Sequence, residues 1–353
     1  MHQALPAAVM MNTVLPDTRP ERLMANLLVT ILGAACAMAT PSAAVAGEAG
    51  PLQLQAKIPL GNVKGRIDHM AVDLARQRLF VAELGNDSLG VVDLDARKLA
   101  RRIAGLKEPQ GVGYVAATDT VYVANAGDGS VRLFRGEALE PAGLIDLESD
   151  ADNVRVDAEK RQVLVGYGNG AIAVIDPSNN AKIADIRLKA HPESFQLSAG
   201  GEIFVNLPGV HAIGVADRAA GQEKASWPTR NLGGNYPMAL DDTAKNVLVA
   251  FRDPPRLVVF AMADGARVAE RDTCGDSDDV FLDGKRKRVY VACGAGFIDV
   301  FDAQGGAYRR VARIPTVSGA RTALFIPALD LLALAVRASG KEPAAIWLYR
   351  PAP

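Results

Sequence analysis

Short apolar stretches recur at a nearly constant spacing along most of the chain. Each is four residues long and begins with Leu, Val or Ile, and the seven copies are residues 79–82, 121–124, 163–166, 203–206, 247–250, 289–292 and 332–335. Successive copies begin 40 to 44 residues apart. Short apolar runs bounded by turn residues are typical of buried β-strands, and a repeat of about 40 to 45 residues is the length of one β-propeller blade. The pattern therefore predicts a repeated all-β unit.

Each copy belongs to the same local series of four strands. A turn rich in Gly, Asn, Asp or Pro follows it, as at Gly127-Asp128-Gly129, and a second apolar strand comes next, as at 131–134. A more polar strand such as 182–186 follows, and a short strand such as 70–73 precedes the copy. Strands joined by tight turns pair antiparallel, and the polar strand suits an exposed outer edge. We expect four antiparallel strands in each blade.

The two ends of the chain complement each other. The last apolar run, 346–349, is the third strand of the seventh unit, and no fourth strand follows it. Residues 52–58 form a spare alternating strand ahead of the first unit. Pairing the two would remove an exposed sheet edge. The sequence thus predicts a seven-bladed β-propeller whose ring is closed by the N-terminal strand of the mature chain.

The recurring four-residue stretch, which we call the repeated phrase, also resembles a known repeat. Val121-Tyr122-Val123-Ala124-Asn125 and its companions are similar to the YVTN-type repeats of bacterial extracytoplasmic seven-bladed propellers, over essentially the whole predicted mature chain. The resemblance implies a fold and a compartment. It implies no single activity, because propellers serve catalysis, ligand binding and scaffolding alike.

The N-terminal region has the features of a secretory signal. Arg19 and Arg22 precede the apolar run 27–32, and the small residues 44–46 end it, so we expect cleavage near Ala46. This divides the chain into a signal with upstream residues, 1–46, and a single propeller, 47–353, that is periplasmic or secreted. Cys36 weakly resembles a lipidation site. No later run is long enough to span a membrane.

The overall charge of the chain indicates which kinds of partner to expect. The chain has 39 Lys and Arg against 40 Asp and Glu, a net charge of −1, with 49% hydrophobic residues. No basic surface for nucleic acid is implied. We expect a monomer whose partner is a small molecule or a periplasmic protein.

Polar residues stand where each unit's first strand begins. In a propeller these positions face the central channel on one face, where function usually gathers. The carboxylate and amide oxygens there could hold a hard cation such as Ca²⁺, and the best candidates are Asp152, Asn153, Glu193, Asn235 and Asp279. The same side chains could instead satisfy free backbone groups at the strand ends and hold channel waters.

Two histidines and several further residues belong to the same face. His69 and His191 each lie near a carboxylate in sequence, so either could act as a general base or be a hydrogen-bonded structural histidine. The remaining binding candidates are Arg66, Asp68, Tyr167, Arg252 and Arg321. The arginines could bind an anionic substrate, or could form interior salt bridges with the acids.

Two further sets of residues have structural interpretations. Cys274 and Cys293 are expected to form a disulfide in an oxidising compartment, the alternative being a thiolate pair for a soft metal or redox partner. Four aspartates stand at the same offset after a first strand and are expected to cap the turn there by accepting backbone N–H groups; they are Asp73, Asp157, Asp241 and Asp283.

Three functions fit this face. The first is a binding protein that holds a small ligand or a protein partner at the polar mouth of the channel. The second is a metal-dependent lactonase or lyase, similar to gluconolactonase-type and streptogramin-lyase propellers, although the former usually have six blades and no run here matches their ligand motifs. The third is a scaffold resembling the large subunit of quinone-bearing amine dehydrogenases, although no cofactor attachment site is present. No G-x-S-x-G elbow, P-loop or dinucleotide fingerprint occurs in a strand-to-helix context.

Overall fold

The computed structural model describes residues 50–340 and 342–353, and these residues form an all-β protein. Its only helical segments are five short 3₁₀ turns, η1 (Leu84–Asn86), η2 (Ala116–Thr118), η3 (Pro208–Val210), η4 (Gln304–Gly306) and η5 (Pro327–Leu329). In this part of the chain, no helix has the length and apolar character needed to cross a membrane. The expected cleavage site near Ala46 and the lipidation candidate Cys36 lie outside the described residues.

The first strands along the chain form sheets in sequence order. After β1 (Leu52–Pro59), the first sheet contains β2 (Met70–Asp73), β3 (Arg78–Glu83), β4 (Ser88–Asp93) and β5 (Lys98–Ala104). The second contains β6 (Pro109–Val115), β7 (Thr120–Asn125), β8 (Ser130–Arg135) and β9 (Glu140–Asp146).

The next eight strands form one sheet of two antiparallel halves. The first half is β10 (Ala151–Asp157), β11 (Gln162–Tyr167), β12 (Ala171–Asp176) and β13 (Ala181–Arg187). The second is β14 (Phe195–Leu197), β15 (Glu202–Leu207), β16 (Ala212–Asp217) and β17 (Gln222–Pro228). A single parallel pairing, Arg187 with Gln222, joins the halves.

Two further sheets of consecutive strands follow, and a final sheet combines strands from both ends of the described chain. They contain β18 (Gly233–Asp241), β19 (Asn246–Asp253), β20 (Pro255–Ala261) and β21 (Arg267–Asp272), then β22 (Ser277–Asp283), β23 (Arg288–Cys293), β24 (Phe297–Asp302) and β25 (Arg309–Pro315). The last has the order β1, β28 (Ala345–Pro351), β27 (Leu331–Val336) and β26 (Ala323–Ile326). There β1 runs antiparallel to β28, with Ile58 opposite Ile346.

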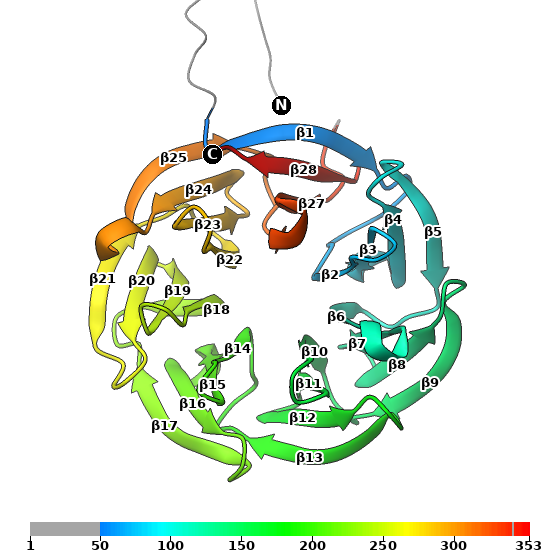
Figure 1. The fold of residues 1–353 in the computed structure, drawn as a ribbon, viewed down its shortest axis with the longest axis horizontal. Helices are drawn as coiled ribbons and strands as arrows, with labels where there is room; N and C mark the ends of the chain where they lie inside the picture. The colour runs from blue at the N-terminus through cyan, green and yellow to red at the C-terminus, as the bar shows by residue number, and fades with distance from the viewer. Residues whose placement is uncertain (1–49, 341) are drawn as a thin grey trace, which may run out of the picture. The chain divides into compact units, whose positions relative to one another are not determined.

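The sheets stand around a central opening, with their first strands innermost (Figure 1). Apolar side chains fill the spaces between neighbouring sheets: Phe80 and Leu89 of the first sheet pack with Val121 and Val123 of the second, all fully buried. Because every sheet buries both faces against its neighbours, its middle strands are continuously apolar, which explains the repeated phrase in the sequence. This confirms an all-β, propeller-like architecture built from four-stranded antiparallel units.

The predicted aspartate caps are confirmed. Asp73 Oδ1 accepts the N–H groups of Ala75 and Arg76, and Asp283 Oδ1 accepts those of Lys285 and Arg286. Asp157 and Asp241 make equivalent bonds to the turns that follow them. These carboxylates close turns that lead from a first strand to a second, and they are distinct from the site described below.

The packing of β1 can be tested with two substitutions on this one strand. We expect Ile58→Ala, which truncates a fully buried side chain, to lower the free energy of unfolding by about 2 to 4 kcal/mol. Leu54 lies on the same strand but is 46% exposed, so Leu54→Ala should change that free energy by less than about 0.5 kcal/mol. Urea unfolding followed by tryptophan fluorescence measures both. Equal effects of the two substitutions would contradict the observed packing of β1.

Candidate functional site

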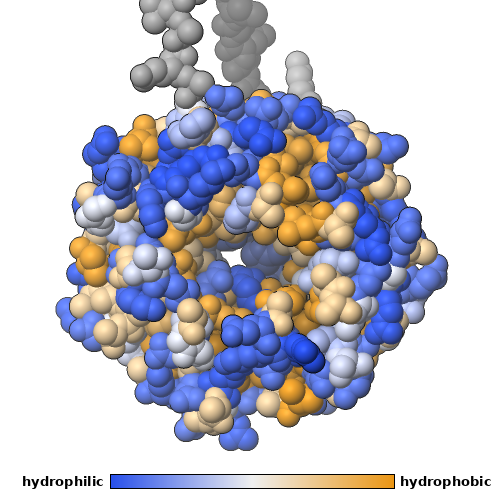
Figure 2. All heavy atoms as spheres, viewed as in Figure 1, coloured by the Kyte–Doolittle hydropathy of each residue, from blue (hydrophilic) through white to orange (hydrophobic). Residues whose placement is uncertain are grey.

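The polar starts of the innermost strands surround a cavity of about 310 Å³, which we call the mouth cavity. Its lining residues lie on, or in the loops next to, the inner strands of all six sheets; they are Arg66, Asp68, His69, Gln110, Asp150, Asp152, His191, Glu193, Tyr236, Arg252, Asp278 and Arg321. Figure 2 shows the opening at the centre of the molecule. The structure thus brings together eight predicted site residues, namely Arg66, Asp68, His69, Asp152, His191, Glu193, Arg252 and Arg321.

β-bulges decide which side chains face this cavity. The pairing of the first strand with the second shifts register between Pro109 and Val112, between Ala151 and Val154, between Asn235 and Met238 and between Ser277 and Asp279. The lining residues of these strands lie within the shifts; they are Gln110, Asp152, Tyr236 and Asp278. A bulge adds a residue and re-aims the side chains near it, which is why bulges are common beside functional sites.

Gly111 lets β6 lie close to β10. A Cβ atom at this position would lie 1.9 Å from the backbone oxygen of Asp152, far inside van der Waals contact. Only glycine therefore lets β6 approach β10 this closely. The approach helps to position the Asp152 backbone beside the mouth cavity.

All three arginines of the mouth cavity are paired with carboxylates. Arg66 Nε donates to Asp68 Oδ2 at 3.0 Å, and Arg321 Nε lies 3.0 Å from Asp278 Oδ2. Arg252 also pairs with Asp278, and its guanidinium stacks 4.0 Å above the Tyr236 ring centroid. Asp276, just outside the lining set, lies 2.7 Å from Arg321 and 3.3 Å from Arg252. Of the two interpretations of these arginines, the geometry favours interior salt bridges.

Asp152 and Glu193 form no ion pair with any residue of the described ranges, 50–340 and 342–353. Asp152 is 5% exposed, and its Oδ1 atom is buried without a hydrogen-bond partner among the described residues. Burial, together with the nearby charges of Asp68 and Glu193, raises the pKa of Asp152 to about 8, although His69 opposes the shift. Burial and the charge of Asp278 raise the pKa of Glu193 to about 7. An unpaired buried carboxylate is costly, so this part of the cavity is poised to accept positive charge or a proton.

The two histidines are held differently. His191 Nδ1 lies 2.6 Å from the carbonyl oxygen of Gly168, which can only accept, so Nδ1 carries a proton. Its nearest carboxylate, Asp150 Oδ2, is 3.9 Å away and half exposed. His69 Nε2 lies 3.7 Å from Asp68 Oδ1, beyond hydrogen-bond distance. A general-base role for either histidine stays a prediction.

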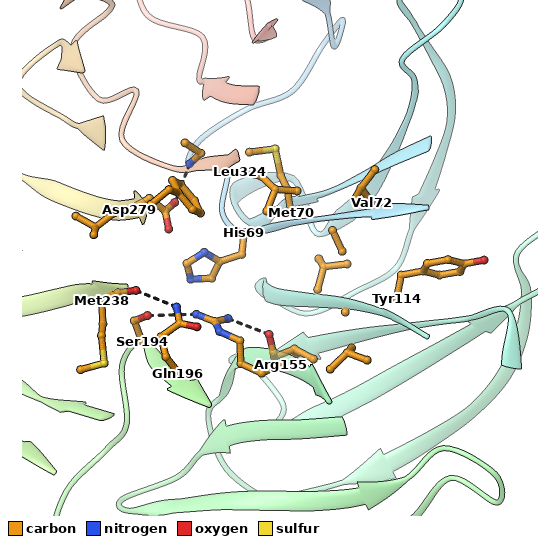
Figure 3. A pocket seen from close by; sticks show the side chains of 18 residues that line it. His69, Met70, Val72, Tyr114, Arg155, Ser194, Gln196, Met238, Asp279 and Leu324 are labelled. Carbon is orange, nitrogen blue, oxygen red and sulfur yellow. Dashed lines mark hydrogen bonds between the residues drawn. The ribbon is translucent and has the colours of Figure 1, made fainter. Parts of the chain in front are cut away.

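A second cavity of about 370 Å³, which we call the inner cavity, shares the lining residue His69 with the first (Figure 3 shows the inner cavity). His69 lines both cavities, while Arg155, Ser194 and Asp279 line only the inner one. Asp279 Oδ2 accepts the backbone N–H of Ala323 at 2.7 Å. Burial raises the pKa of Asp279 well above its usual value and lowers the pKa of Arg155.

The predicted set of metal ligands is split by the structure. Asp152 and Glu193 line the mouth cavity, Asp279 lines the inner cavity, and Asn153 and Asn235 line neither. Asn235 is fully buried and donates to Asn206 Oδ1 and to the backbone oxygen of Ala212, which ties β18 to the preceding sheet. Within residues 50–340 and 342–353, no group of three His, Cys, Asp or Glu is arranged to hold a metal ion. The five candidates therefore do not line one cavity, and an ion shared by all five stays a prediction.

Tyr167 is also not part of the mouth cavity. Its hydroxyl donates to Asp185 Oδ1 on the outermost strand β13, at 2.9 Å, and Lys182 lies over its ring. The side chain of Tyr167 therefore extends from β11 toward the outer strand β13 and does not line the mouth cavity.

The mouth cavity also includes residues that the predicted set lacked. Gln110, Tyr236 and Asp278 stand at starts of first strands, and Asp150 lies in the loop before β10. In the sequence, Asp278 stands directly before Asp279, so the polar start of this strand could be recognised. Which member of such a pair faces the mouth depends on the bulge, and no residue type marks the bulge in the sequence.

Cys274 and Cys293 form a disulfide with a Cα–Cα distance of 5.8 Å. Both cysteines are buried, and the bond joins the loop before β22 to the end of β23. That loop carries Asp276, the carboxylate shared by Arg252 and Arg321. The disulfide therefore holds one side of the mouth in place.

Comparison with known proteins supports the fold. No family model matches the chain, and no curated protein matches it. Among solved structures, hydrazine synthase from Kuenenia stuttgartiensis is similar, with a TM-score of 0.67 and 16% sequence identity over 76% of this chain and 91% of that one. At this identity the likeness shows a shared fold and nothing about shared chemistry.

The pH dependence of stability tests whether the Asp152 carboxylate is unpaired in the folded protein. In the unfolded chain Asp152 has a pKa near 4, so between about pH 4 and pH 8 the folded state holds its proton more tightly, and ionisation progressively destabilises the folded state as pH rises. We expect Asp152→Asn to match wild type near pH 4 and to exceed it at pH 8 by about 1 kcal/mol or more in free energy of unfolding. Urea unfolding across this pH range measures the difference.

A matched control comes from Asp217, which accepts the backbone N–H groups of Ala219 and Ala220 and whose pKa those bonds lower. Asp217→Asn should give no gain in stability at pH 8. A variant of Asp152 that is no more stable than wild type at pH 8 would show that the carboxylate is not held unpaired in the folded protein.

Proposed function

We propose that this chain is an extracytoplasmic, seven-bladed β-propeller of the YVTN-repeat type that binds a small organic cation in its mouth cavity. The observation that carries the proposal is the Asp152 carboxylate, which is buried, faces the cavity and has an oxygen with no partner among the described residues. Seven first strands, the repeated phrase and the pairing of β1 with β28 support the ring. The signal-like N-terminus and the disulfide support a compartment outside the cytoplasm.

The charge of the lining points to a cation. The mouth cavity has five carboxylates, Asp68, Asp150, Asp152, Glu193 and Asp278, against three guanidinium groups, Arg66, Arg252 and Arg321. The arginines are neutralised by Asp68, Asp278 and the neighbouring Asp276. Among the described residues, the carboxylates of Asp152 and Glu193 are left without an ion-pair partner, and a ligand cation would pair with them.

An organic cation suits the geometry better than a metal ion. An ammonium group has three donors that can reach separate carboxylate oxygens, whereas Ca²⁺ needs six or more oxygens converging on one point. The five predicted ligands do not line one cavity. For this reason the mouth supports a binding protein better than a metal-dependent lactonase or lyase.

Binding of a simple amine tests the proposal. We expect hexylamine to bind the purified protein and Asp152→Asn to weaken that binding about tenfold or more, because one ion pair in a buried setting is lost. Isothermal titration calorimetry measures the affinity. Glu140→Gln, on the exposed outer strand β9, is the control for overall charge and should bind hexylamine as wild type does.

The same titration has a defined pH dependence. Affinity for hexylamine should rise between about pH 6 and pH 8.5, because Glu193 and Asp152 must be ionised to pair with the cation. Failure of hexylamine to bind at any pH in this range, or equal binding by Asp152→Asn, would overturn the proposal. Tight binding of Ca²⁺ with no binding of the amine would do so in favour of a metal site.

A further inference from the structure

The inner cavity supplies a second charged group close to the cation site. The mouth and inner cavities share His69, and consecutive residues divide between them, with Glu193 and Asp278 in the mouth and Ser194 and Asp279 in the inner cavity. Asp152 and Arg155 likewise lie on the same strand, β10, one in each cavity. A ligand of modest length could therefore contact both sets of side chains.

Arg155 is the cationic group of the inner cavity. Its Nε donates to the backbone oxygen of Phe195 at 2.9 Å, Nη1 to that of Val154 at 2.9 Å, and Nη2 to Ser194 Oγ at 3.2 Å (Figure 3). A guanidinium has five N–H groups, so two remain for another acceptor. In the described part of the chain no carboxylate forms an ion pair with it. This differs from the three arginines of the mouth cavity, which are all paired with acids.

The carboxyl group of Asp279 lines the same cavity as Arg155 but already accepts a hydrogen bond from another part of the chain. Its Oδ2 atom accepts the backbone N–H of Ala323, which anchors the side chain to the neighbouring sheet rather than to Arg155. Burial also favours the neutral form of this carboxyl group. The guanidinium of Arg155 is thus held by two carbonyl oxygens and one hydroxyl, an arrangement that positions it while no described carboxylate forms an ion pair with it, although the nearby charges of Asp279 and Asp152 favour its charged form.

We infer that the ligand is a zwitterion, with an ammonium group in the mouth cavity against Asp152 and Glu193 and a carboxylate in the inner cavity against Arg155. The inference rests on the proposed function, since it takes the cation site as given and assigns the other end of the molecule. A guanidinium held by its neighbours can accept a carboxylate through two parallel N–H bonds. ω-Amino acids are the simplest compounds with this distribution of charge.

A matched set of ligands tests the inference. We expect at least one member of the series from 4-aminobutanoate to 8-aminooctanoate to bind wild type about tenfold or more tightly than the alkylamine of equal chain length, because the amine lacks the bond to Arg155. The corresponding alkanoates should bind more weakly than the amino acids. Calorimetry near pH 8 compares all three classes under identical conditions.

Two substitutions test whether Arg155 is responsible for the tighter binding of the amino acids. Arg155→Gln should remove the advantage of the amino acid while leaving alkylamine binding within about twofold of wild type. Arg271→Gln is the control for loss of one arginine, because Arg271 lies on the outer strand β21 and bonds to the backbone oxygen of Ala307; it should preserve the advantage. If Arg155→Gln does not fold, the comparison of ligands on wild type still decides.

The outcomes separate this inference from the proposed function. Equal binding of every amino acid and its matching amine would overturn the zwitterion and leave the cation site standing. Tighter binding of the alkanoate than of the amino acid would overturn it in favour of an anion site at Arg155. Absence of binding by both amines and amino acids would overturn the cation site as well.

Discussion

The convergence of the innermost strands on one axis is the constraint on which the rest of the site depends. Each sheet must bury both faces against its neighbours, so its middle strands are apolar and its polar residues are confined to strand ends and the outer edge. The starts of the innermost strands meet around the mouth cavity, where several of the charged side chains are largely buried. Polar groups placed there must satisfy one another or leave a charge for a ligand.

The mouth cavity contains polar groups of both kinds, some that pair with one another and some that are left for a ligand. Arg66, Arg252 and Arg321 are matched by carboxylates, and the disulfide fixes the loop that carries the shared Asp276. Removing one partner of such a pair would expose an uncompensated charge, so these residues form a rigid frame. Asp152 and Glu193 stand within the frame without a partner. Their raised pKa values express the cost of keeping them there, and that cost would be relieved by a bound cation.

The sequence was informative wherever a feature repeats. The phrase containing Val121-Tyr122-Val123 revealed the middle strands, the polar starts of the first strands revealed the face of the site, and eight predicted residues do line one cavity. Two individual choices differ from the lining of the mouth cavity. Asp279 was chosen where Asp278 faces the mouth, and Tyr167 was included although its hydroxyl bonds to Asp185. A bulge changes which side chain points inward, and it depends on backbone pairing that the residue types do not reveal.

Proton release on binding tests the central claim most directly. Calorimetric titration of hexylamine into the protein at about pH 7.5, repeated in buffers of different ionisation enthalpy, gives the number of protons exchanged per ligand bound. If the cation pairs with Asp152 and Glu193, these groups must ionise on binding, and the account predicts release of on the order of one proton. Binding with no net proton release would mean that the cation is held elsewhere and would contradict the account.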